Sequence, residues 1–493
     1  MNPKKSFYIT TTLPYVNAPL HMGHALEFVR ADTIARYKKL TGFDVYFNTG
    51  TDEHGMKIYE KAKEHGIDPK DFVDEGFEIF KEQLKMFGVS KDIHFIRTTD
   101  KHHEEAAQEF WRRVQKNGYI YKKNYETKYC VGCESEKTDS ELVDGECPIH
   151  PGRKIEIINE ENYFFKFSEF QDKLLEFYDK NPNFVVPEFR FNEMKSFVER
   201  GLQDFSISRL KEKMPWGIEV PGDSAHVMYV WFDALVNYIS TLGWPFGSAQ
   251  DLRPEENLFE KYWVNGNPTQ YCGKDNTRFQ AVMWQAMLMA ADVPNSHQIV
   301  VNGFITALGG VRMSKTLGNV VDPRDIVKEY GTDALRYFLL REVSSFEDSP
   351  FTLERFKDAY NSGLANGLGN LVSRAMNMAV SYGVSLSDLP NPAGDLANGR
   401  WTQDEINSFD LNKAMNEIWR FISTLNESIQ RTEPFKKIKI DKEGAHKDIR
   451  EVVGGLLGIS KILEPFLPET AEKIRKYILE NKKPEAPLFL RKE

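Results

Sequence analysis

The sequence predicts an α/β protein: a doubly wound parallel sheet with a metal-binding insertion, followed by a separate all-α helical bundle. Three observations support this fold class. Strands and helices alternate from Phe7, three of the four cysteines lie between Cys130 and Cys147, and strand-like runs stop after about Thr352. Alternating strands and helices are typical of open parallel sheets, whose ligands bind at the C-terminal ends of the strands.

The composition is that of an ordinary globular protein. The 493 residues are enough for about three compact units, and 41% of them are apolar. The net charge of −9 argues against a protein that coats nucleic acid, although local basic patches can still bind RNA. We find no apolar run of roughly 18 residues, as a membrane helix requires, and no signal or transit peptide. We therefore expect a cytoplasmic protein that spans no membrane.

The first strand is expected at Phe7–Thr12, followed by a proline-containing loop at Leu13–Pro19 and a helix from near Leu20 to about Leu40. A second strand begins at Val45 and ends at the motif GTDEHG. Further strand-to-loop transitions are expected at HVMYVWFDAL, TQYCGKD and QIVVNGFIT. Polar motifs directly after strands are expected to share one edge of the sheet.

Two other regions interrupt or follow this pattern. Short β-like runs surround the cysteines between about Tyr119 and Phe167, which indicates an insertion folded around a metal. Residues 353–480 have apolar positions spaced by three and four, broken by the proline- and glycine-rich segment Leu389–Gly399. This spacing predicts amphipathic helices packed in a bundle.

The insertion contains the pattern C-x2-C-x13-C-x2-H, formed by Cys130, Cys133, Cys147 and His150. Two ligand pairs on two turns can surround a tetrahedral ion, and three thiolates with one imidazole suit Zn²⁺. Because all four positions are filled, we expect one structural zinc ion per chain. The alternative is a metal-free set of thiols, as in a degenerate knuckle.

The motif PLHMGH places His21 and His24 three residues apart at the beginning of a helix. Both imidazoles then lie on one face, beside backbone N–H groups that favour an anion. Gly23 would let a phosphate approach the backbone closely. The alternative is that these are two surface or core histidines at a helix N-terminus.

A second basic segment, GGVRMSKTLGN at Gly309–Asn319, carries Arg312, Ser314 and Lys315 between glycines. Such a cationic loop could follow a departing pyrophosphate. Taken alone, this string is better explained as a solvated basic loop, and only its combination with PLHMGH favours phosphate chemistry.

PLHMGH resembles the HIGH signature of class I aminoacyl-tRNA synthetases, and RMSKT resembles their KMSKS loop. The longer strings TTTLPYVNAPLHMGH, TGTDEHG, VWFDALVNY, GKD and DPRDIVKEYGTDALRYFLL are similar to methionyl-tRNA synthetases, from about Phe7 to about Lys437. The resemblance implies that L-methionine reacts with ATP to give methionyl-adenylate and pyrophosphate. The methionyl group is then transferred to the 3′-terminal ribose of tRNA(Met).

The resemblance also implies an ATP site. His21 and His24 would stabilise charge on the α-phosphate, and Lys315 would neutralise pyrophosphate together with the Mg²⁺ that accompanies ATP. Gly273 and Asp275 of GKD would contact the ribose. Gly23, Arg312 and Ser314 complete the implied set; Arg312 replaces the family's lysine, and Asn276 replaces a common isoleucine.

The implied methionine site has an anion for the ammonium group and an apolar and aromatic box for the thioether. Asp52 would hold the amine, Arg209 would organise that site, and Trp231 and Tyr238 would enclose the side chain. The implied set is Leu13, Tyr15, Asp52, Arg209, Trp231, Ala234, Leu235, Tyr238 and Asn302. From spacing alone, WFDALVNY is better explained as helix core. Asn302 replaces the family's usual histidine.

For the tRNA, the resemblance assigns the anticodon to the helical region. Asn370 and Arg374 lie four residues apart on one predicted helix face, and Phe435 stands where the family usually has tryptophan. Aromatic rings can stack on bases while Asn or Arg reads their edges. The alternative is that Phe435 packs inside the bundle and the neighbouring lysines form a solvated face.

The resemblance divides the chain into four segments: a Rossmann-like catalytic first half (1–118), a connective insertion with the zinc knuckle (119–225), a catalytic second half (226–352) and a helical anticodon-binding domain (353–493). There is no room for the editing insertion of the leucyl, isoleucyl and valyl enzymes. We see no counterpart of the family's optional C-terminal β-barrel, so we expect a monomer. The remaining alternative is a catalytically degenerate paralogue that still binds tRNA, for which Asn302, Arg312 and Asn276 are the best support.

Overall fold

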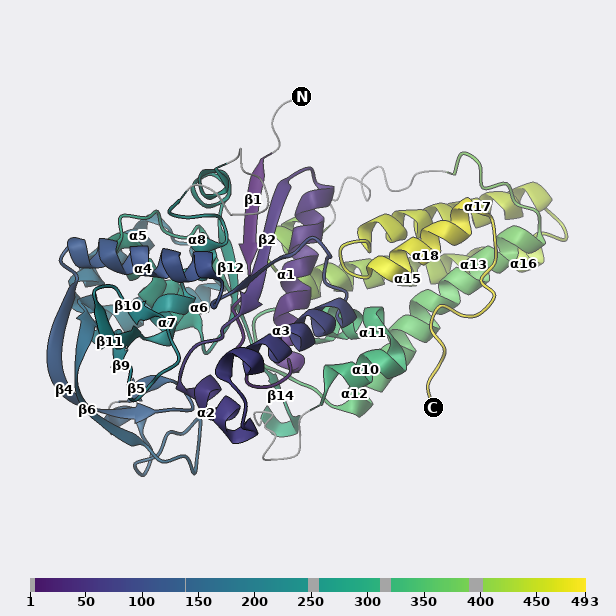
Figure 1. Ribbon diagram of the computed structural model, residues 1–493. Coiled ribbons are helices and arrows are strands. Elements are labelled where there is room, and N and C mark those ends of the chain that lie inside the picture. The colour runs from purple at the N-terminus through teal and green to yellow at the C-terminus, as the bar shows by residue number, and fades with distance from the viewer. Residues whose placement is uncertain (1–4, 138, 247–256, 311–320, 390–401) are drawn as a thin grey trace. The chain divides into compact units, whose positions relative to one another are not determined.

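The structure is a computed structural model that describes residues 5–137, 139–246, 257–310, 321–389 and 402–493 (Figure 1). The chain forms two compact units. The first consists of residues 1–20, 41–83 and 91–301, and the second of residues 21–40, 84–90 and 302–493. The four segments predicted from the sequence stay a prediction.

The first unit is built on a six-stranded sheet in the order β3-β2-β1-β12-β13-β7. Its strands are β1 Ser6–Thr10, β2 Asp44–Thr51, β3 His94–Arg97, β7 Val185–Val186, β12 Thr269–Gly273 and β13 Gln298–Asn302. β1 pairs in parallel with β2 on one side and with β12 on the other. Strand order therefore reverses at β1, as in a doubly wound Rossmann-like sheet, and the predicted fold class is confirmed.

The insertion is a long antiparallel hairpin of β4 (Ile120–Cys130) and β6 (Glu156–Phe165), extended by β5 (Ser135–Lys137) and β8 (Phe205–Ser206). The two long strands pair without interruption from Ile120 opposite Phe165 to Tyr129 opposite Glu156. They are longer than the short runs expected from the sequence. Exposed polar residues such as Lys122 and Lys123 weaken the apolar alternation that would have revealed their length.

The segment HVMYVWFDAL forms a strand and a helix, but the strand does not join the parallel sheet. β11 (Asp223–Met228) pairs antiparallel with β9 (Ser208–Leu210) and β10 (Glu219–Val220) in a sheet of its own. It leads into two short helices, α7 (Val230–Ala234) and α8 (Asn237–Ser240).

The core of the first unit is aromatic. Helix α4 (Lys101–Lys116) buries Phe110 and Trp111, and the Phe110 ring packs against Phe232, Trp244 and Trp284 at centroid distances of 5.7 to 5.9 Å. The other helices up to residue 300 are α1 Met22–Leu40, α2 Met56–His65, α3 Pro69–Met86, α5 Gln171–Lys180, α6 Glu188–Glu199 and α9 Trp284–Ala290.

The second unit is almost entirely helical. The last described strands are the short parallel pair β14 (Ile305–Thr306) and β15 (Ser349–Pro350). Its described α-helices after β14 are α10 Pro323–Tyr330, α11 Thr332–Tyr337, α12 Leu353–Ala359, α13 Asn370–Ser381, α14 Gln403–Asn407, α15 Leu411–Thr432, α16 Pro434–Lys437, α17 Lys442–Ile462 and α18 Pro468–Leu479. α17 packs against α13, α15 and α18, so the predicted bundle is present (Figure 1). Within the described residues, no helix is long and apolar enough to cross a membrane.

Candidate active site and metal centre

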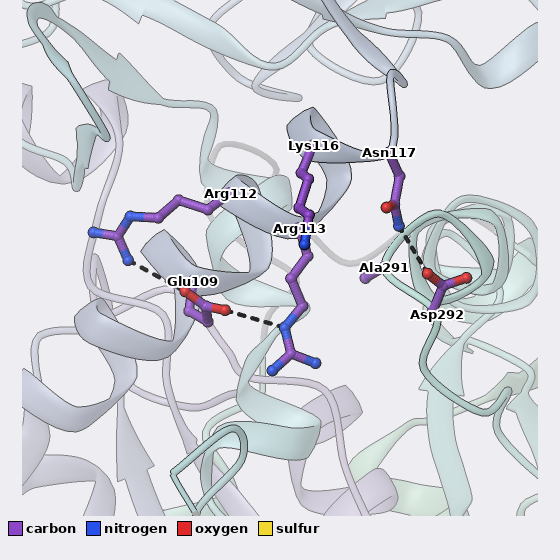
Figure 2. Close-up of a pocket in the computed structure, with 7 residues that line it drawn as sticks. All are labelled: Glu109, Arg112, Arg113, Lys116, Asn117, Ala291 and Asp292. Carbon is purple, nitrogen blue, oxygen red and sulfur yellow. Dashed lines mark hydrogen bonds and ion pairs between the residues drawn. The ribbon is translucent and has the colours of Figure 1, made fainter.

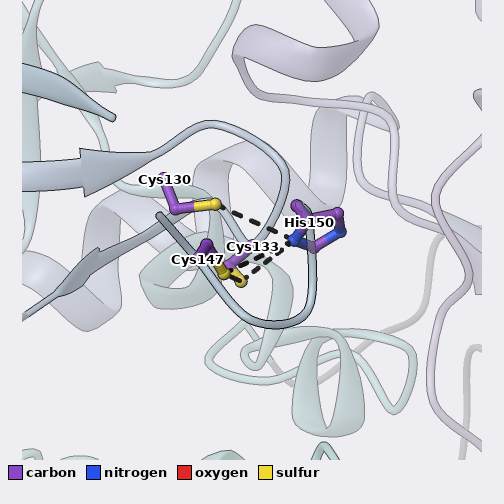
Figure 3. Close-up of side chains that lie close together, drawn as sticks. All are labelled: Cys130, Cys133, Cys147 and His150. Atoms are coloured by element: carbon purple, nitrogen blue, oxygen red, sulfur yellow. Dashed lines mark hydrogen bonds between the residues drawn. The ribbon is translucent and has the colours of Figure 1, made fainter. Parts of the chain in front are cut away.

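The four predicted metal ligands meet at the end of the β4–β6 hairpin (Figure 3). Nδ1 of His150 lies 3.3 Å from Sγ of Cys133 and 3.8 Å from Sγ of both Cys130 and Cys147. The Cys133 and Cys147 sulfurs are 3.5 Å apart. A tetrahedral ion bound by sulfur at about 2.3 Å gives ligand–ligand separations of roughly 3.8 Å. The four donors thus have the size and composition of a closed tetrahedral metal site.

Glycine at position 132, between the first two cysteines, permits this geometry. A Cβ atom at Gly132 would lie only 2.5 Å from Cγ of His150, so no other residue fits beneath the imidazole. We call residues 130–150 the cysteine knuckle. Because all four positions are filled by protein, such a site is structural rather than catalytic.

In the second unit, His21 directly precedes the first residue of α1, and His24 lies in the first turn of that helix. Their rings stack with centroids 3.8 Å apart, and Nδ1 of His21 accepts from the backbone N–H of Gly23 at 3.1 Å. Nδ1 of His24 in turn accepts from the backbone N–H of His21 at 3.3 Å. Because both Nδ1 atoms accept, each neutral ring carries its proton on Nε2. The sequence prediction that both imidazoles lie together as donors at a helix start is consistent with this geometry.

Burial and the neighbouring His21 lower the pKa of His24 well below its ordinary value. His24 is therefore a neutral N–H donor at pH 7 and does not supply a permanent positive charge. A Cβ at Gly23 would lie 3.0 Å from the His21 ring, so glycine also leaves room for the stacked pair.

At the C-terminal edge of the parallel sheet, the loop after β1 joins the loop after β2. Tyr15 and Asp52 form an isolated parallel bridge, in which the N–H of Asp52 donates to the carbonyl of Pro14 at 3.1 Å. Gly273 ends the adjacent strand β12, and Asp275 follows it in an exposed position. Three of the motifs found in the sequence thus share the edge where parallel sheets bind ligands.

Asp52 is a buried carboxylate without a cation. Its residue is 3% exposed, and no ion pair to it exists within the described residues. Burial, followed by the nearby Asp233 and Glu134, raises the pKa of Asp52 well above its ordinary value. Its neighbour Glu53 differs, because Arg97 binds the Glu53 carboxylate through two contacts at 2.7 and 2.9 Å. Asp52 is therefore the group in this loop that an incoming ammonium would stabilise.

Arg209 of β9 is flanked by two aromatic rings. Its guanidinium is 4.9 Å from the ring centroid of Tyr129 and 5.3 Å from that of Tyr229, distances typical of cation–π contacts. It also donates to the Ser206 hydroxyl and the Ser208 carbonyl, both at 2.7 Å. Arg209 thus links the end of β4 to the segment before α7, in keeping with an organising role.

Of the residues on WFDALVNY, Trp231 is the one that is partly exposed. Its ring stacks on Phe279 with centroids 3.9 Å apart and planes 4° apart. Leu235 and Tyr238 are buried in the aromatic core, where the Tyr238 hydroxyl accepts from Nε2 of Gln280. Ala234 is also buried, and Leu13 is half-buried. The helix-core explanation therefore fits Leu235 and Tyr238 better than it fits Trp231.

Asn302 ends β13 and is held by Arg30 of α1. Nη1 of Arg30 donates to Oδ1 of Asn302 at 2.8 Å and to the Ser345 carbonyl at 2.8 Å. The asparagine is 3% exposed, and its Nδ2 has no hydrogen-bond partner within the described part of the chain. The predicted residues Arg312, Ser314 and Lys315 lie outside the described residues.

The predicted anticodon residues lie on helices of the second unit. Asn370 begins α13 and is exposed, and Arg374 follows one turn later and is half-buried. Phe435 lies on α16 and is 39% exposed. The ring is therefore partly open to solvent, and its role in stacking on the anticodon stays a prediction.

Sequence reasoning missed two buried groups of the first unit. Asp233 of α7 pairs with Nδ1 of His54 at 3.2 Å and lies 3.9 Å from Nε2 of His103. Although burial opposes ionisation, His54 and His103 lower the pKa of Asp233, and Asp233 raises that of His54. The second group is Glu134, whose pKa burial raises to about 7. The motifs TDEHG and WFDAL show that His54 and Asp233 are present, but the sequence does not show that these two distant side chains form a pair.

A surface hollow at the C-terminal end of α4 contains none of the predicted site residues (Figure 2). Arg112 and Arg113 extend from one side of it and pair with Glu109, and Asn117 contacts Asp292 on the other. Arg112, Arg113 and Asp292 already have partners within the protein, and no predicted site residue lines the hollow, so it is not a candidate for the methionine or nucleotide site.

The comparisons with known proteins agree with this geometry. The family described as tRNA synthetases class I (M) matches residues 7–154 and 149–376. A methionine–tRNA ligase of Caldanaerobacter subterraneus subsp. tengcongensis is 42% identical over 484 residues, covering 96% of this chain and 73% of that protein. The methionine–tRNA ligase of Thermotoga maritima is 37% identical over 497 residues, covering 97% and 76%.

Solved structures give the same result. Mycobacterium tuberculosis methionyl-tRNA synthetase in complex with methionyl-adenylate has a TM-score of 0.86 at 36% identity, covering 95% of this chain and 93% of that one. Its apo form has a TM-score of 0.81 at 31% identity, covering 100% and 99%. The fold and the family match define the chain as a class I tRNA synthetase. Within that class, it belongs to the methionine–tRNA ligases.

Proposed function

We propose that this chain is a ligase that activates L-methionine with ATP and transfers the methionyl group to tRNA(Met). The observation that supports this most strongly is Asp52, a buried carboxylate without a cation at the C-terminal edge of the parallel sheet. The α-ammonium of methionine would supply the missing charge. Trp231, partly exposed and stacked on Phe279, is suited to pack against an unbranched thioether.

In the first step, a methionine carboxylate oxygen attacks the α-phosphorus of ATP, and pyrophosphate leaves. No protein nucleophile takes part, so positioning and charge stabilisation supply the rate enhancement. His21 and His24 are proposed to donate from Nε2 to the α-phosphate, while Lys315, Arg312 and Ser314 of the predicted loop neutralise the pyrophosphate.

In the second step, a hydroxyl of the 3′-terminal ribose attacks the methionyl carbonyl carbon, and AMP leaves. Gly23 of the ATP site, together with Gly273 and Asp275 at the end of β12, is proposed to hold the adenosine phosphate and ribose through both steps. Asn370, Arg374 and Phe435 are proposed to read the anticodon from the second unit.

Two metals belong to this proposal. The cysteine knuckle is proposed to hold one Zn²⁺, because three thiolates and one imidazole at these separations suit that ion. Mg²⁺ is proposed to enter with ATP and to screen the triphosphate.

We also propose that the protein is cytoplasmic and monomeric. Sedimentation at micromolar concentration would test the monomeric state.

Methionine-dependent exchange of pyrophosphate into ATP tests the reaction directly. The wild-type chain should catalyse it, and Lys315→Ala should reduce the rate steeply while the circular dichroism spectrum is retained. Addition of tRNA(Met) should give methionyl-tRNA. A chain that binds tRNA(Met) but exchanges no pyrophosphate would be the degenerate paralogue, and the proposal would be wrong.

A further inference from the structure

Glu134 follows the knuckle ligand Cys133 and has an unusual environment. The residue is 1% exposed, and its backbone has φ of 48°, in the left-handed region that non-glycine residues rarely adopt. A buried glutamate normally requires a partner, since burial of an uncompensated carboxylate is costly.

The partner of Glu134 is the loop that carries Asp52. Oε1 of Glu134 accepts from the backbone N–H of Lys57 at 2.8 Å, at the first turn of α2. α2 has no side-chain cap from Gly55, its own N-cap residue, so the glutamate takes that role from a distance of 77 residues in sequence.

Gly55 makes this approach possible. A Cβ atom at Gly55 would lie 2.6 Å from Oε2 of Glu134 and 3.0 Å from Oε1, and its backbone φ of 106° is one that side chains disfavour. Only glycine at the last position of TDEHG leaves room for the Glu134 carboxylate.

The backbone of Glu134 reaches the other methionine segment. The Tyr229 hydroxyl donates to its carbonyl, and Tyr229 stands two residues before Trp231. Tyr129, directly before the knuckle ligand Cys130, packs with Tyr229 around Arg209. The knuckle therefore contacts both segments that carry proposed methionine-binding residues.

We propose that Glu134 is a positioning residue for methionine activation, which fastens the cysteine knuckle to the loop of Asp52 so that metal binding orders the methionine site. The inference rests on the proposed function, because it assigns Asp52 to the substrate ammonium. Glu134 acts through the backbone of α2 and does not itself touch the reacting atoms.

The test compares Glu134→Ala with Glu134→Gln in the zinc-loaded chain. The alanine variant loses the acceptor for the Lys57 N–H, whereas the glutamine variant keeps an amide oxygen there. We expect Glu134→Ala to raise KM for methionine about tenfold, in line with the loss of one helix cap, with KM for ATP unchanged. Glu134→Gln should stay within about threefold of wild type. Glu126→Ala, an exposed glutamate of the same hairpin, is the matched control and should equal wild type.

A second measurement does not depend on activity. Hydrogen–deuterium exchange of the peptide covering residues 51–60 should increase in Glu134→Ala, while elemental analysis still finds one zinc per chain. Removal of zinc from wild type should increase the same exchange, and removal from Glu134→Ala should add little, because the connection is already broken.

Three results would overturn the inference: unchanged KM for methionine and unchanged exchange in Glu134→Ala, equal damage in Glu134→Gln, or loss of zinc in Glu134→Ala. Equal damage would mean that charge, and not the hydrogen bond, is what matters. Failure of the proposed function is recognised separately, because wild type itself would then exchange no pyrophosphate while the deuterium measurement could still succeed.

Discussion

A buried ion pair joins α1, the helix that begins directly after His21, to the C-terminal bundle. Asp32 of α1 and Arg336 of α11 are both fully buried, with Nη1 and Oδ2 2.9 Å apart. Arg336 also donates to the carbonyls of Phe466 at 2.7 Å and Pro465 at 3.0 Å, just after α17. Replacement of Arg336 by methionine would keep much of the side-chain volume and leave Asp32 without this partner.

Removal of one member of a buried ion pair lowers the free energy of unfolding by about 3–5 kcal/mol. Asp32 would keep Arg36 at 2.7 Å and the N–H of Ser90 at 2.8 Å, so we expect the lower end of that range. A loss of about 3 kcal/mol lowers the melting temperature of a unit of this size by roughly 6–12 °C. Arg324→Met, which breaks an exposed pair with Asp322, is the matched control and should cost less than about 1 kcal/mol.

The assay is a double-mutant cycle in urea, followed by helical circular dichroism. Arg336→Met, Asp32→Asn and their combination should give a combined loss smaller than the sum of the two single losses. Additive losses, or a loss of less than about 1 kcal/mol in Arg336→Met, would refute the reasoning.

The stability contributed by this ion pair should also depend on pH. Although burial opposes it, Arg336 and then Arg36 lower the pKa of Asp32 in the folded chain. The stabilisation is therefore present above the unfolded carboxyl pKa of about 4 and is lost as the pH falls through the lower folded value, so the difference between wild type and Asp32→Asn should shrink in acid.

Three further predictions concern the substrates and the metal. Burial, Asp233 and Glu134 raise the pKa of Asp52, and a bound ammonium would lower it again, so methionine binding should release a proton. KM for methionine should therefore rise as the pH falls through the raised pKa. In exchange assays from pH 5.5 to 8, Asp52→Asn should raise KM for methionine and flatten this pH profile. Elemental analysis should find one zinc per chain, and Cys147→Ser should lose it and increase deuterium exchange at the end of the β4–β6 hairpin; a zinc-free, equally protected wild type would contradict the site. Arg374→Ala and Phe435→Ala should each slow aminoacylation of tRNA(Met) about tenfold or more while pyrophosphate exchange stays normal, and a parallel loss of both activities would contradict a separate anticodon role.

Local sequence patterns were sufficient for the elements whose signals are themselves local. β1, α1 and β2 follow directly from apolar periodicity, and the cysteine knuckle follows from the spacing of Cys130 to His150. The partner of β11 could not be predicted, because a strand's sequence does not specify whether it joins a parallel or an antiparallel neighbour. The role of Glu134 could not be predicted either, because it depends on a hydrogen bond to a residue 77 positions away and on a left-handed backbone conformation. The local sequence around Cys133 indicates neither of these features.

The environment of Asn302, a position where the family usually has histidine, depends on a long-range contact with Arg30. In the sequence, asparagine stands where the family usually has histidine, and its side chain can also donate a hydrogen bond. In the structure, Arg30 is 272 residues away in sequence and donates to the side chain of Asn302. A guanidinium has only donors, so it must face the amide oxygen, which fixes the orientation of the amide and turns Nδ2 away from Arg30. Nδ2 is buried and has no acceptor within the described residues. Arg30 thereby holds the amide of Asn302 in one orientation, in which the Nδ2 group faces away from the guanidinium.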